Sequence, residues 1–204
     1  MFRESEDSEP IHTRPESHAS FVAIFVSMIG EVYFTDIKKH ILAHLNSAEK
    51  SIKLGVSWLT DREIFNLLLQ KLTAGIEVSL VTRNDYLNNH PEALEWNDFI
   101  KAGGKLYFSR NGEQLHYKFI LADDKAVLCA SYNLTCFANG NNRENVMTFT
   151  DADFVNKFVT EFDYLTSTLP LQTSVQRMQL SNVPEELHGF YRNSLENDKA
   201  KQVV

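Results

Sequence analysis

Between Ser51 and Phe108 the apolar residues change repeatedly from the two-residue period of a strand to the spacing of a helix. Strands are predicted over 51–58, 76–81 and 105–108, with one helix between Thr60 and Gly75 and another over 92–102. Strands that alternate with helices are typical of crossover connections around a sheet. The sequence therefore predicts an α/β fold with a mixed, largely parallel central sheet flanked by helices on both faces.

The segments on either side extend this pattern. A helix capped by Asp36 is predicted over 36–48, and a strand over 145–150 precedes a long helix from about Asp151 to Leu165. Thr60 is expected to cap the helix that it precedes. We expect three parts, namely a flexible acidic tail (1–18), a single domain (19–169) and a C-terminal extension (170–204) that is partly helical or disordered.

Composition limits the function less than the order of the elements does. A net charge of −7 argues against a surface that binds polyanions everywhere, but residues 101–150 hold six Lys or Arg against four Asp or Glu. The two cysteines fit no metal or redox spacing, which favours a cytoplasmic location. The longest apolar stretch, Phe21 to Ile29, is too short to span a bilayer and is expected to be a buried strand or helix, or alternatively an interfacial anchor.

The segment HYKFILADDKAVLCASYN, residues 116–133, predicts a β-hairpin with four polar side chains at its open end. His116 and Lys118 share one face of the first strand, because side chains alternate along a strand. A two-residue loop at 124–125 places Lys118 opposite Ser131 and His116 opposite Asn133. Directly opposed Cβ atoms are about 5 Å apart, so the four groups form one patch.

This patch has the groups that bind and attack a phosphoryl centre. Lys118 supplies positive charge, and Ser131 and Asn133 donate hydrogen bonds to phosphoryl oxygens. His116 attacks phosphorus or transfers a proton. The alternative is that four polar residues at the open end of a hairpin only contact water, and the residue types alone do not favour catalysis over this alternative.

The spacing of His-x-Lys, Asp123 and Ser-x-Asn resembles the HKD motif of the phospholipase D superfamily. Glu144 also occupies a position where that family usually carries an acid. The resemblance extends from about Glu31 to Leu165 and implies a phospholipase D-like fold. One position departs from the family pattern, because Ala130 stands where glycine usually precedes the serine. In the predicted register Ala130 faces Phe119, away from the patch.

The resemblance implies a metal-independent phosphodiesterase that needs no cofactor. In that family two motifs form one active site, where one histidine becomes a phosphohistidine and the other protonates the leaving oxygen. This chain has one motif, since no other histidine is followed two residues later by Lys. The resemblance therefore implies a homodimer in which two copies of His116 share one site. Glu144 is the candidate that orients His116, and Asp123 is expected to support the hairpin turn.

The motif does not choose among phosphodiester substrates. The small endonuclease branch is the most similar, so the expected substrate is nucleic acid, DNA or RNA. Arg110 and Arg143 are candidates for its phosphates, and Phe137 for stacking on a base. The alternatives are a phospholipid hydrolase of the cardiolipin type and a non-catalytic dimeric scaffold or binding module. Membrane association is not expected, and the termini are candidates for contacts within a larger protein assembly.

Overall fold

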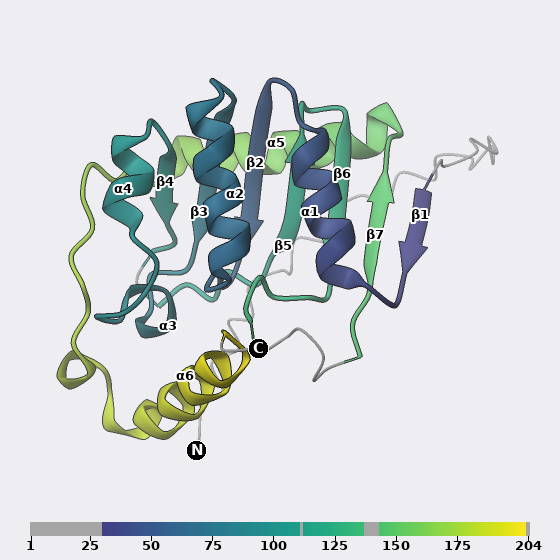
Figure 1. Ribbon diagram of the computed structural model, residues 1–204. Helices are drawn as coiled ribbons and strands as arrows, with labels where there is room; N and C mark the ends of the chain where they lie inside the picture. Colours follow the sequence, from purple (N-terminus) through teal and green to yellow (C-terminus); the bar gives the residue numbers. More distant parts are fainter. Residues whose placement is uncertain (1–29, 111, 137–142, 203–204) are drawn as a thin grey trace, which may run out of the picture.

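The computed structural model describes residues 30–110, 112–136 and 143–202, which form one seven-stranded sheet with helices on both sides (Figure 1). The strands are β1 (Gly30–Tyr33), β2 (Ser51–Val56), β3 (Glu77–Thr82), β4 (Lys105–Phe108), β5 (Lys118–Ala122), β6 (Ala126–Ala130) and β7 (Val146–Phe149). The helices are α1 (Ile37–Ser47), α2 (Arg62–Thr73), α3 (Tyr86–Asn89), α4 (Trp96–Lys101), α5 (Ala152–Thr168) and α6 (His188–Gln202), with 3₁₀ turns at Leu180–Asn182 and Glu185–Leu187. The predicted acidic tail and the apolar stretch Phe21 to Ile29 lie outside the described residues.

The strands follow the order β1-β7-β6-β5-β2-β3-β4. Only the β2–β3 and β3–β4 pairs are parallel, whereas the four other pairs are antiparallel. The prediction of a mixed α/β sheet with helices on both faces is confirmed, but the prediction that the sheet is largely parallel is wrong. The crossover connections create parallel pairs only among β2, β3 and β4, and the hairpin then joins the free side of β2 antiparallel.

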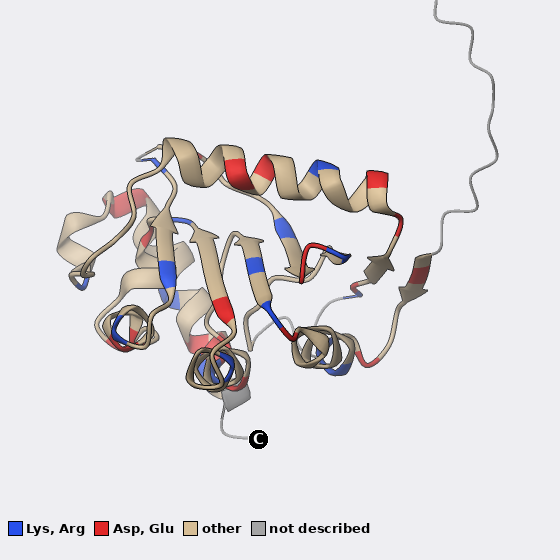
Figure 2. Ribbon diagram, turned by 90° about the horizontal axis from the view of Figure 1, so that it is seen from above, with Lys and Arg blue, Asp and Glu red and all other residues tan. Residues whose placement is uncertain are grey.

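Helices α1, α2 and α4 cover one face of the sheet, and α5 crosses the other (Figure 2). The first face buries the even-numbered residues of β2, β5 and β6, including Leu54, Ile120 and Leu128. The opposite face buries odd-numbered residues such as Phe119 and Leu121 against α5. This alternation is expected of strands that are covered on both sides.

Glycine at position 55 allows the aromatic packing on the α5 face. Gly55 pairs with Phe119 across β2 and β5, and a Cβ atom built on Gly55 lies 2.6 Å from the Phe119 ring. A larger residue at 55 therefore forces Phe119 to move. Phe119 in turn contacts Phe158 and Phe162 of α5, with ring centroids 5.3 and 6.4 Å away. The long helix predicted from about Asp151 is therefore confirmed, and its aromatic residues pack on the sheet.

Several element boundaries differ from the prediction. Asp61, rather than Thr60, caps α2, because its carboxylate accepts hydrogen bonds from the backbone N–H groups of residues 63 and 64. Asp36 occupies the N-cap position of α1, but its side chain makes no capping hydrogen bond. The helix predicted over 92–102 is shorter and begins at Trp96, while α3 lies before the His90-Pro91 step. Strand β1 at the sheet edge was not predicted.

The hairpin register differs by one residue from the prediction. Phe119 pairs with Cys129, and the loop contains three residues, 123–125, rather than two. Continued by one step, this register places Lys118 at the level of Ala130 instead of Ser131. Ala130 therefore belongs to the Lys118 face of the hairpin and does not face Phe119.

The cause of this register is the conformation of the turn. Asp123 and Asp124 have φ angles of 56° and 53°, and the Lys125 N–H donates to the Ala122 carbonyl at 3.0 Å. The Asp123 carboxylate also accepts hydrogen bonds from the backbone N–H groups of residues 49, 50 and 51, at the start of β2. Contacts with a distant segment thus hold a loop that a two-residue turn rule does not predict.

The C-terminal extension folds back over the domain. Its first residues run beside β4, where the Gln172 N–H donates to the Leu106 carbonyl at 2.8 Å. It ends in α6, which lies beneath the lower edge of the sheet in the view of Figure 1 and beside α3. Helix α6 reaches Gln202, so it is much longer than the short helix that the sequence predicts near 184–191. In the described part of the chain, no helix has the length and apolar character needed to cross a bilayer.

We expect the charge of Asp123 to stabilise the fold. Burial acts to raise the pKa of this carboxyl, but the backbone N–H groups of 51, 49 and 50 lower it overall. A lowered pKa means that the stabilisation is present above the pKa of the unfolded chain and is lost as the pH falls through the folded pKa. Asp123→Asn should therefore lower the free energy of unfolding by about 1–3 kcal/mol at pH 7 and flatten its acid dependence, as measured by urea denaturation at several pH values.

Asp124→Asn is the matched control, since Asp124 has nearly the same φ angle but is exposed and pairs only with Lys53 across 2.9 Å among the described contacts. Its substitution should cost less than about 1 kcal/mol. Equal losses for the two variants would contradict a specific role for Asp123.

Candidate active site

The polar groups of the hairpin lie at one edge of the sheet. Strands β2, β3 and β4 end at this edge, β5 begins there, and β6 ends there, because β5 is antiparallel to both β2 and β6. The Ser57 N–H donates to the Tyr117 carbonyl at 2.9 Å and continues the β2–β5 ladder past the last strand residue. This hydrogen bond positions the backbone next to His116.

His116 and Lys118 are in direct contact. The Lys118 Nζ atom lies 3.2 Å from the His116 Nε2 atom and 3.2 Å from the His116 carbonyl oxygen. The imidazole is exposed, whereas the lysine is half-buried. An exposed imidazole beside a fixed cation is open to a substrate and close to a group that binds anions.

Electrostatics favour the neutral, nucleophilic form of His116. The positive charge of Lys118 lowers the pKa of His116, and burial and Arg83 lower it further. The pKa of Lys118 is also lowered, chiefly by burial, although Glu144 acts in the opposite direction and Arg83 adds to the decrease. A histidine that attacks phosphorus needs an unprotonated ring nitrogen, and these charges increase the fraction that has one.

Ser131 and Glu144 lie next to this pair. The Ser131 hydroxyl donates to the Glu144 carboxylate and accepts a hydrogen bond from the Asn145 N–H at 3.0 Å. Since the charge of Glu144 also acts on Lys118, the carboxylate links the end of β6 to the start of β5. That Glu144 orients the imidazole remains a prediction.

Asn133 has an unusual environment. Its Oδ1 atom is buried and has no hydrogen-bond partner among the residues that the structure describes. The preceding residue, Tyr132, is fully buried in the core, so Asn133 follows a rigid anchor. A buried polar atom without a partner costs about 1–3 kcal/mol.

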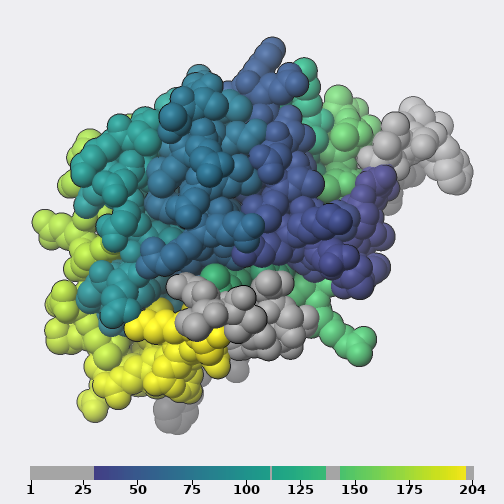
Figure 3. All heavy atoms as spheres, viewed as in Figure 1, coloured from purple at the N-terminus to yellow at the C-terminus, as the bar shows by residue number. Residues whose placement is uncertain are grey.

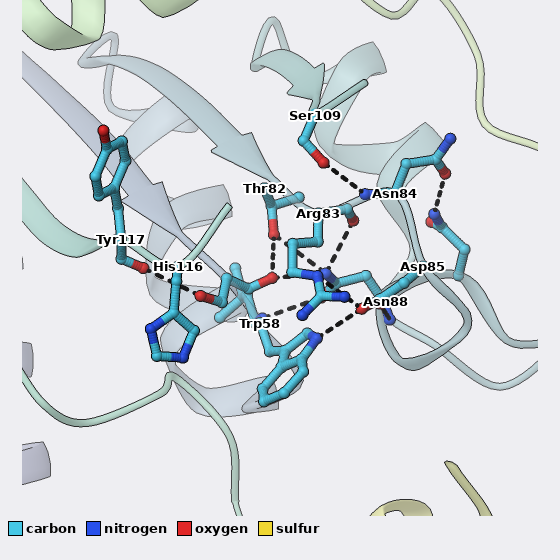
Figure 4. A network of polar contacts seen from close by, with 12 residues as sticks. Trp58, Thr82, Arg83, Asn84, Asp85, Asn88, Ser109, His116 and Tyr117 are labelled. Carbon is cyan, nitrogen blue, oxygen red and sulfur yellow. Dashed lines mark hydrogen bonds and ion pairs between the residues drawn. The ribbon is translucent and has the colours of Figure 1, made fainter. Parts of the chain in front are cut away.

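Sequence reasoning missed Arg83, which follows β3 at the same edge. Its Nε atom lies 3.1 Å from the Asp85 carboxylate, and its guanidinium carbon lies 5.2 Å from the centre of a Trp58 ring. The Trp58 indole N–H also donates to Asp85 at 2.8 Å. In Figure 4 the guanidinium lies between the His116 ring and Asp85. The only sequence signal was a basic residue directly after an apolar strand.

Asn88 connects the strand ends beneath this arginine. Its Nδ2 group donates to the carbonyls of Ser57 and Arg83 at 2.9 and 3.0 Å, and its Oδ1 atom accepts from the Leu59 N–H at 3.1 Å. The side chain is fully buried, and Figure 4 shows it at the centre of this network. It therefore fixes the spacing between the ends of β2 and β3.

The structure places the other predicted site residues in different parts of the molecule. Asp123 lies at the opposite end of the hairpin from His116, so the structure does not bring it to the site. Arg110 donates from its guanidinium to the Thr168 carbonyl at 3.4 Å, at the end of α5. Arg143 is exposed beside Glu144. Phe137 lies outside the described residues. For Arg110, Arg143 and Phe137, a role in substrate binding stays a prediction.

Comparison with known proteins identifies the family. Residues 41–166 match the family model described as "Cardiolipin synthase, PLD-like domain". The chain belongs to the phospholipase D superfamily. The predicted family is confirmed, and the matched range contains the hairpin, Arg83 and Glu144 but ends before the C-terminal extension.

Relatives within the superfamily include proteins named mitochondrial cardiolipin hydrolase. That of Chlamydomonas reinhardtii is 27% identical over 124 residues, which are 61% of this chain and 55% of the relative. The Homo sapiens protein is 34% identical over 91 residues, which are 44% of this chain and 34% of the relative. The chain thus spans about half the length of the curated relatives that it matches, or less.

A solved structure confirms the phospholipase D-like fold. The Salmonella typhimurium protein Nuc, a phospholipase D family member, superposes with a TM-score of 0.62 at 20% identity, over 71% of this chain and 98% of Nuc. Helicobacter pylori NucT gives a TM-score of 0.59, also at 20% identity, over 70% of this chain and 98% of NucT. At this level of identity the likeness establishes the fold.

Replacing Lys118 by Met should raise the pKa of His116, because it removes the positive charge that contributes most to lowering it. An NMR titration of the His116 ring protons measures this shift even when the variant is inactive. Lys125→Met is the control, since Lys125 is exposed at the far end of the same hairpin. An unchanged His116 pKa in Lys118→Met would contradict the proposed electrostatic coupling.

Proposed function

We propose that this chain is a phosphodiesterase whose nucleophile is His116. The observation that carries this proposal is the direct contact between an exposed imidazole and Lys118, together with the nearby positive charges that lower the pKa of the imidazole. Membership of the phospholipase D superfamily supports the same chemistry. Lys118, Ser131 and Asn133 bind the non-bridging oxygens and stabilise the charge of the transition state.

The reaction proceeds by two displacements at phosphorus. An unprotonated ring nitrogen of His116 forms a bond to phosphorus while the bond to the leaving oxygen breaks, and a second imidazole gives that oxygen a proton. The second imidazole then takes a proton from water, whose oxygen attacks phosphorus and releases His116. Because imidazole serves as nucleophile and cationic side chains bind the oxygens, no step requires a metal or another cofactor.

The second imidazole comes, in this proposal, from another copy of the chain. The sequence contains one His-x-Lys pair, and His116 is exposed at the sheet edge, where a second copy can approach. A two-fold axis next to this edge brings the two His116 side chains to one phosphate.

We propose nucleic acid as the substrate. Arg83 and Lys118 act on the same imidazole, which concentrates positive charge at the site of a chain whose net charge is −7. Such a local concentration fits a strand that carries a phosphate on every nucleotide. The names of the relatives favour a second candidate, hydrolysis of cardiolipin.

His116→Ala should lower the turnover of bis(p-nitrophenyl) phosphate in EDTA by a factor on the order of 10³ or more. The fold should be retained, because the side chain is exposed. His40→Ala is the control, since His40 lies on α1 and stacks on Tyr33 of β1, the edge strand three strands away from β5. A His116→Ala protein as active as the parent would remove the proposed nucleophile, and an inert parent would favour a non-catalytic scaffold.

Mixing parent and His116→Ala subunits should test the shared site. If both copies of His116 are needed, equal amounts of the two subunits, unfolded and refolded together, should leave about one quarter of the parent activity. If each chain holds a complete site, about one half should remain. Sedimentation should show a dimer, and an active monomer would contradict the shared site.

Labelled single-stranded DNA, duplex DNA, RNA and cardiolipin vesicles should be offered to the parent and to His116→Ala. We expect cleavage of nucleic acid that persists in EDTA and falls steeply as salt rises, because phosphate contacts are screened. Cleavage of cardiolipin with no cleavage of any nucleic acid would replace the first proposal by the second.

A further inference from the structure

A cavity of about 310 Å³ lies beside the candidate active site. Its inner wall consists of the chain after β3 and β4, and its outer wall is formed by residues 178–191 of the C-terminal extension. Its lining includes the arginines Arg83 and Arg110, the carboxylates Asp85 and Glu113, and the apolar residues Met178 and Leu187. Figure 3 shows that the extension runs around one side of the molecule and along the lower edge.

Arg83 belongs to both the cavity and the candidate active site. It lines the cavity, and its charge acts on His116 and Lys118. Asp85 holds the Nε atom and Trp58 contacts the guanidinium face, so the planar group is fixed in position. The ion pair with Asp85 uses one edge of the guanidinium. Because this group has five N–H donors in a rigid planar fork, the remaining donors suit a phosphate.

The outer wall is apolar and well anchored. Leu187, 41% exposed, and Met178 line the cavity beside Tyr191, whose ring contacts the Tyr86 ring at a centroid distance of 5.5 Å. The Met178 N–H donates to the Asn89 carbonyl at 2.7 Å. The extension is thereby attached to α3, which follows directly after the loop that carries Arg83.

Arg177 strengthens this attachment. Its guanidinium donates to the carbonyls of Ala93 and Leu94 at 3.0 and 2.9 Å and pairs with Glu95 at 2.9 Å. The extension is therefore a fixed wall of the cavity. It lies beyond residue 166, where the match to the family model ends.

We propose that this cavity binds the nucleotide adjacent to the scissile phosphate, with Arg83 on the neighbouring phosphate and the extension against the base. This inference rests on the proposed nucleic-acid substrate. A fixed arginine next to an apolar wall fits a nucleotide, which carries an anionic phosphate and a planar ring that stacks on or packs against apolar groups. The volume suits one small ligand unit, near the lower limit of roughly 300 Å³ for ligand pockets.

The phosphate contact is tested with a chemically modified strand. In a short oligonucleotide, the phosphate on either side of the scissile one is replaced in turn by a neutral methylphosphonate. For one of the two positions, the parent should lose about tenfold in kcat/KM, while Arg83→Gln, already weaker, should lose little more, as expected of two groups in contact. Equal and independent losses in the parent and in Arg83→Gln at both positions would overturn the contact.

The wall is tested with Leu187→Glu, which places a negative charge in the cavity. The ratio of kcat/KM for the oligonucleotide to that for bis(p-nitrophenyl) phosphate should fall by about tenfold, because the small diester does not extend into the cavity. Leu171→Glu is the matched control, since Leu171 is 51% exposed in the same extension but pairs with Tyr107 away from the cavity. Its ratio should equal that of the parent.

The outcomes separate the two proposals. A parent that cleaves oligonucleotides, with an unchanged ratio in Leu187→Glu, would overturn the subsite and leave the nuclease proposal in place. A parent that cleaves bis(p-nitrophenyl) phosphate but no nucleic acid would overturn both. Urea denaturation of each variant shows whether a change in the ratio follows from altered binding in a folded protein.

Discussion

The antiparallel pairing of β2 with β5 is the constraint on which the candidate active site depends. Five residue pairs, from Ile52 with Ala122 to Val56 with Lys118, join the parallel part of the sheet to the antiparallel part. Because the two strands run in opposite directions, the end of β2 lies beside the start of β5. His116, from the hairpin, and Arg83, from the parallel strands, therefore meet at one edge although 33 residues separate them in sequence.

The positive charges at this edge suit a site that binds a phosphoryl group. Two cations act on one exposed imidazole, which costs free energy in the empty protein but favours an anionic substrate. Asp85 and Trp58 limit this cost for Arg83, and Glu144 does so for Lys118. The site thus combines two fixed cations with an imidazole whose pKa they lower, and each cation has a nearby partner that keeps it in place.

The C-terminal extension follows the part of the chain that matches the family model. It contributes no residue to the hairpin, but it packs on α3, whose Asn88 fixes the ends of β2 and β3. Arg83 lies in the short loop between β3 and α3. Through this packing, a segment outside the matched family range becomes part of the surroundings of the candidate active site.

The sequence was most informative where a structure depends on neighbours in the chain. The apolar periods of 51–58 and 151–165 predicted a strand and a helix, which the structure has at 51–56 and 152–168, because each pattern reflects which side of a single element is buried. The spacing of His116, Lys118, Ser131 and Asn133 likewise predicted one hairpin, β5 and β6, because these residues are close in sequence. Their part in catalysis stays a prediction.

Contacts between distant segments decided the rest. The register of the hairpin follows from a turn in which Asp123 binds three backbone N–H groups at the start of β2, about 70 residues earlier in the chain. The place of Arg83 and of the extension depends on which strand ends share an edge, and no local pattern contains that information. The sequence by itself determined the chemical groups and the elements that carry them, whereas the tertiary structure decided which groups meet, because pairing across the sheet sets those distances.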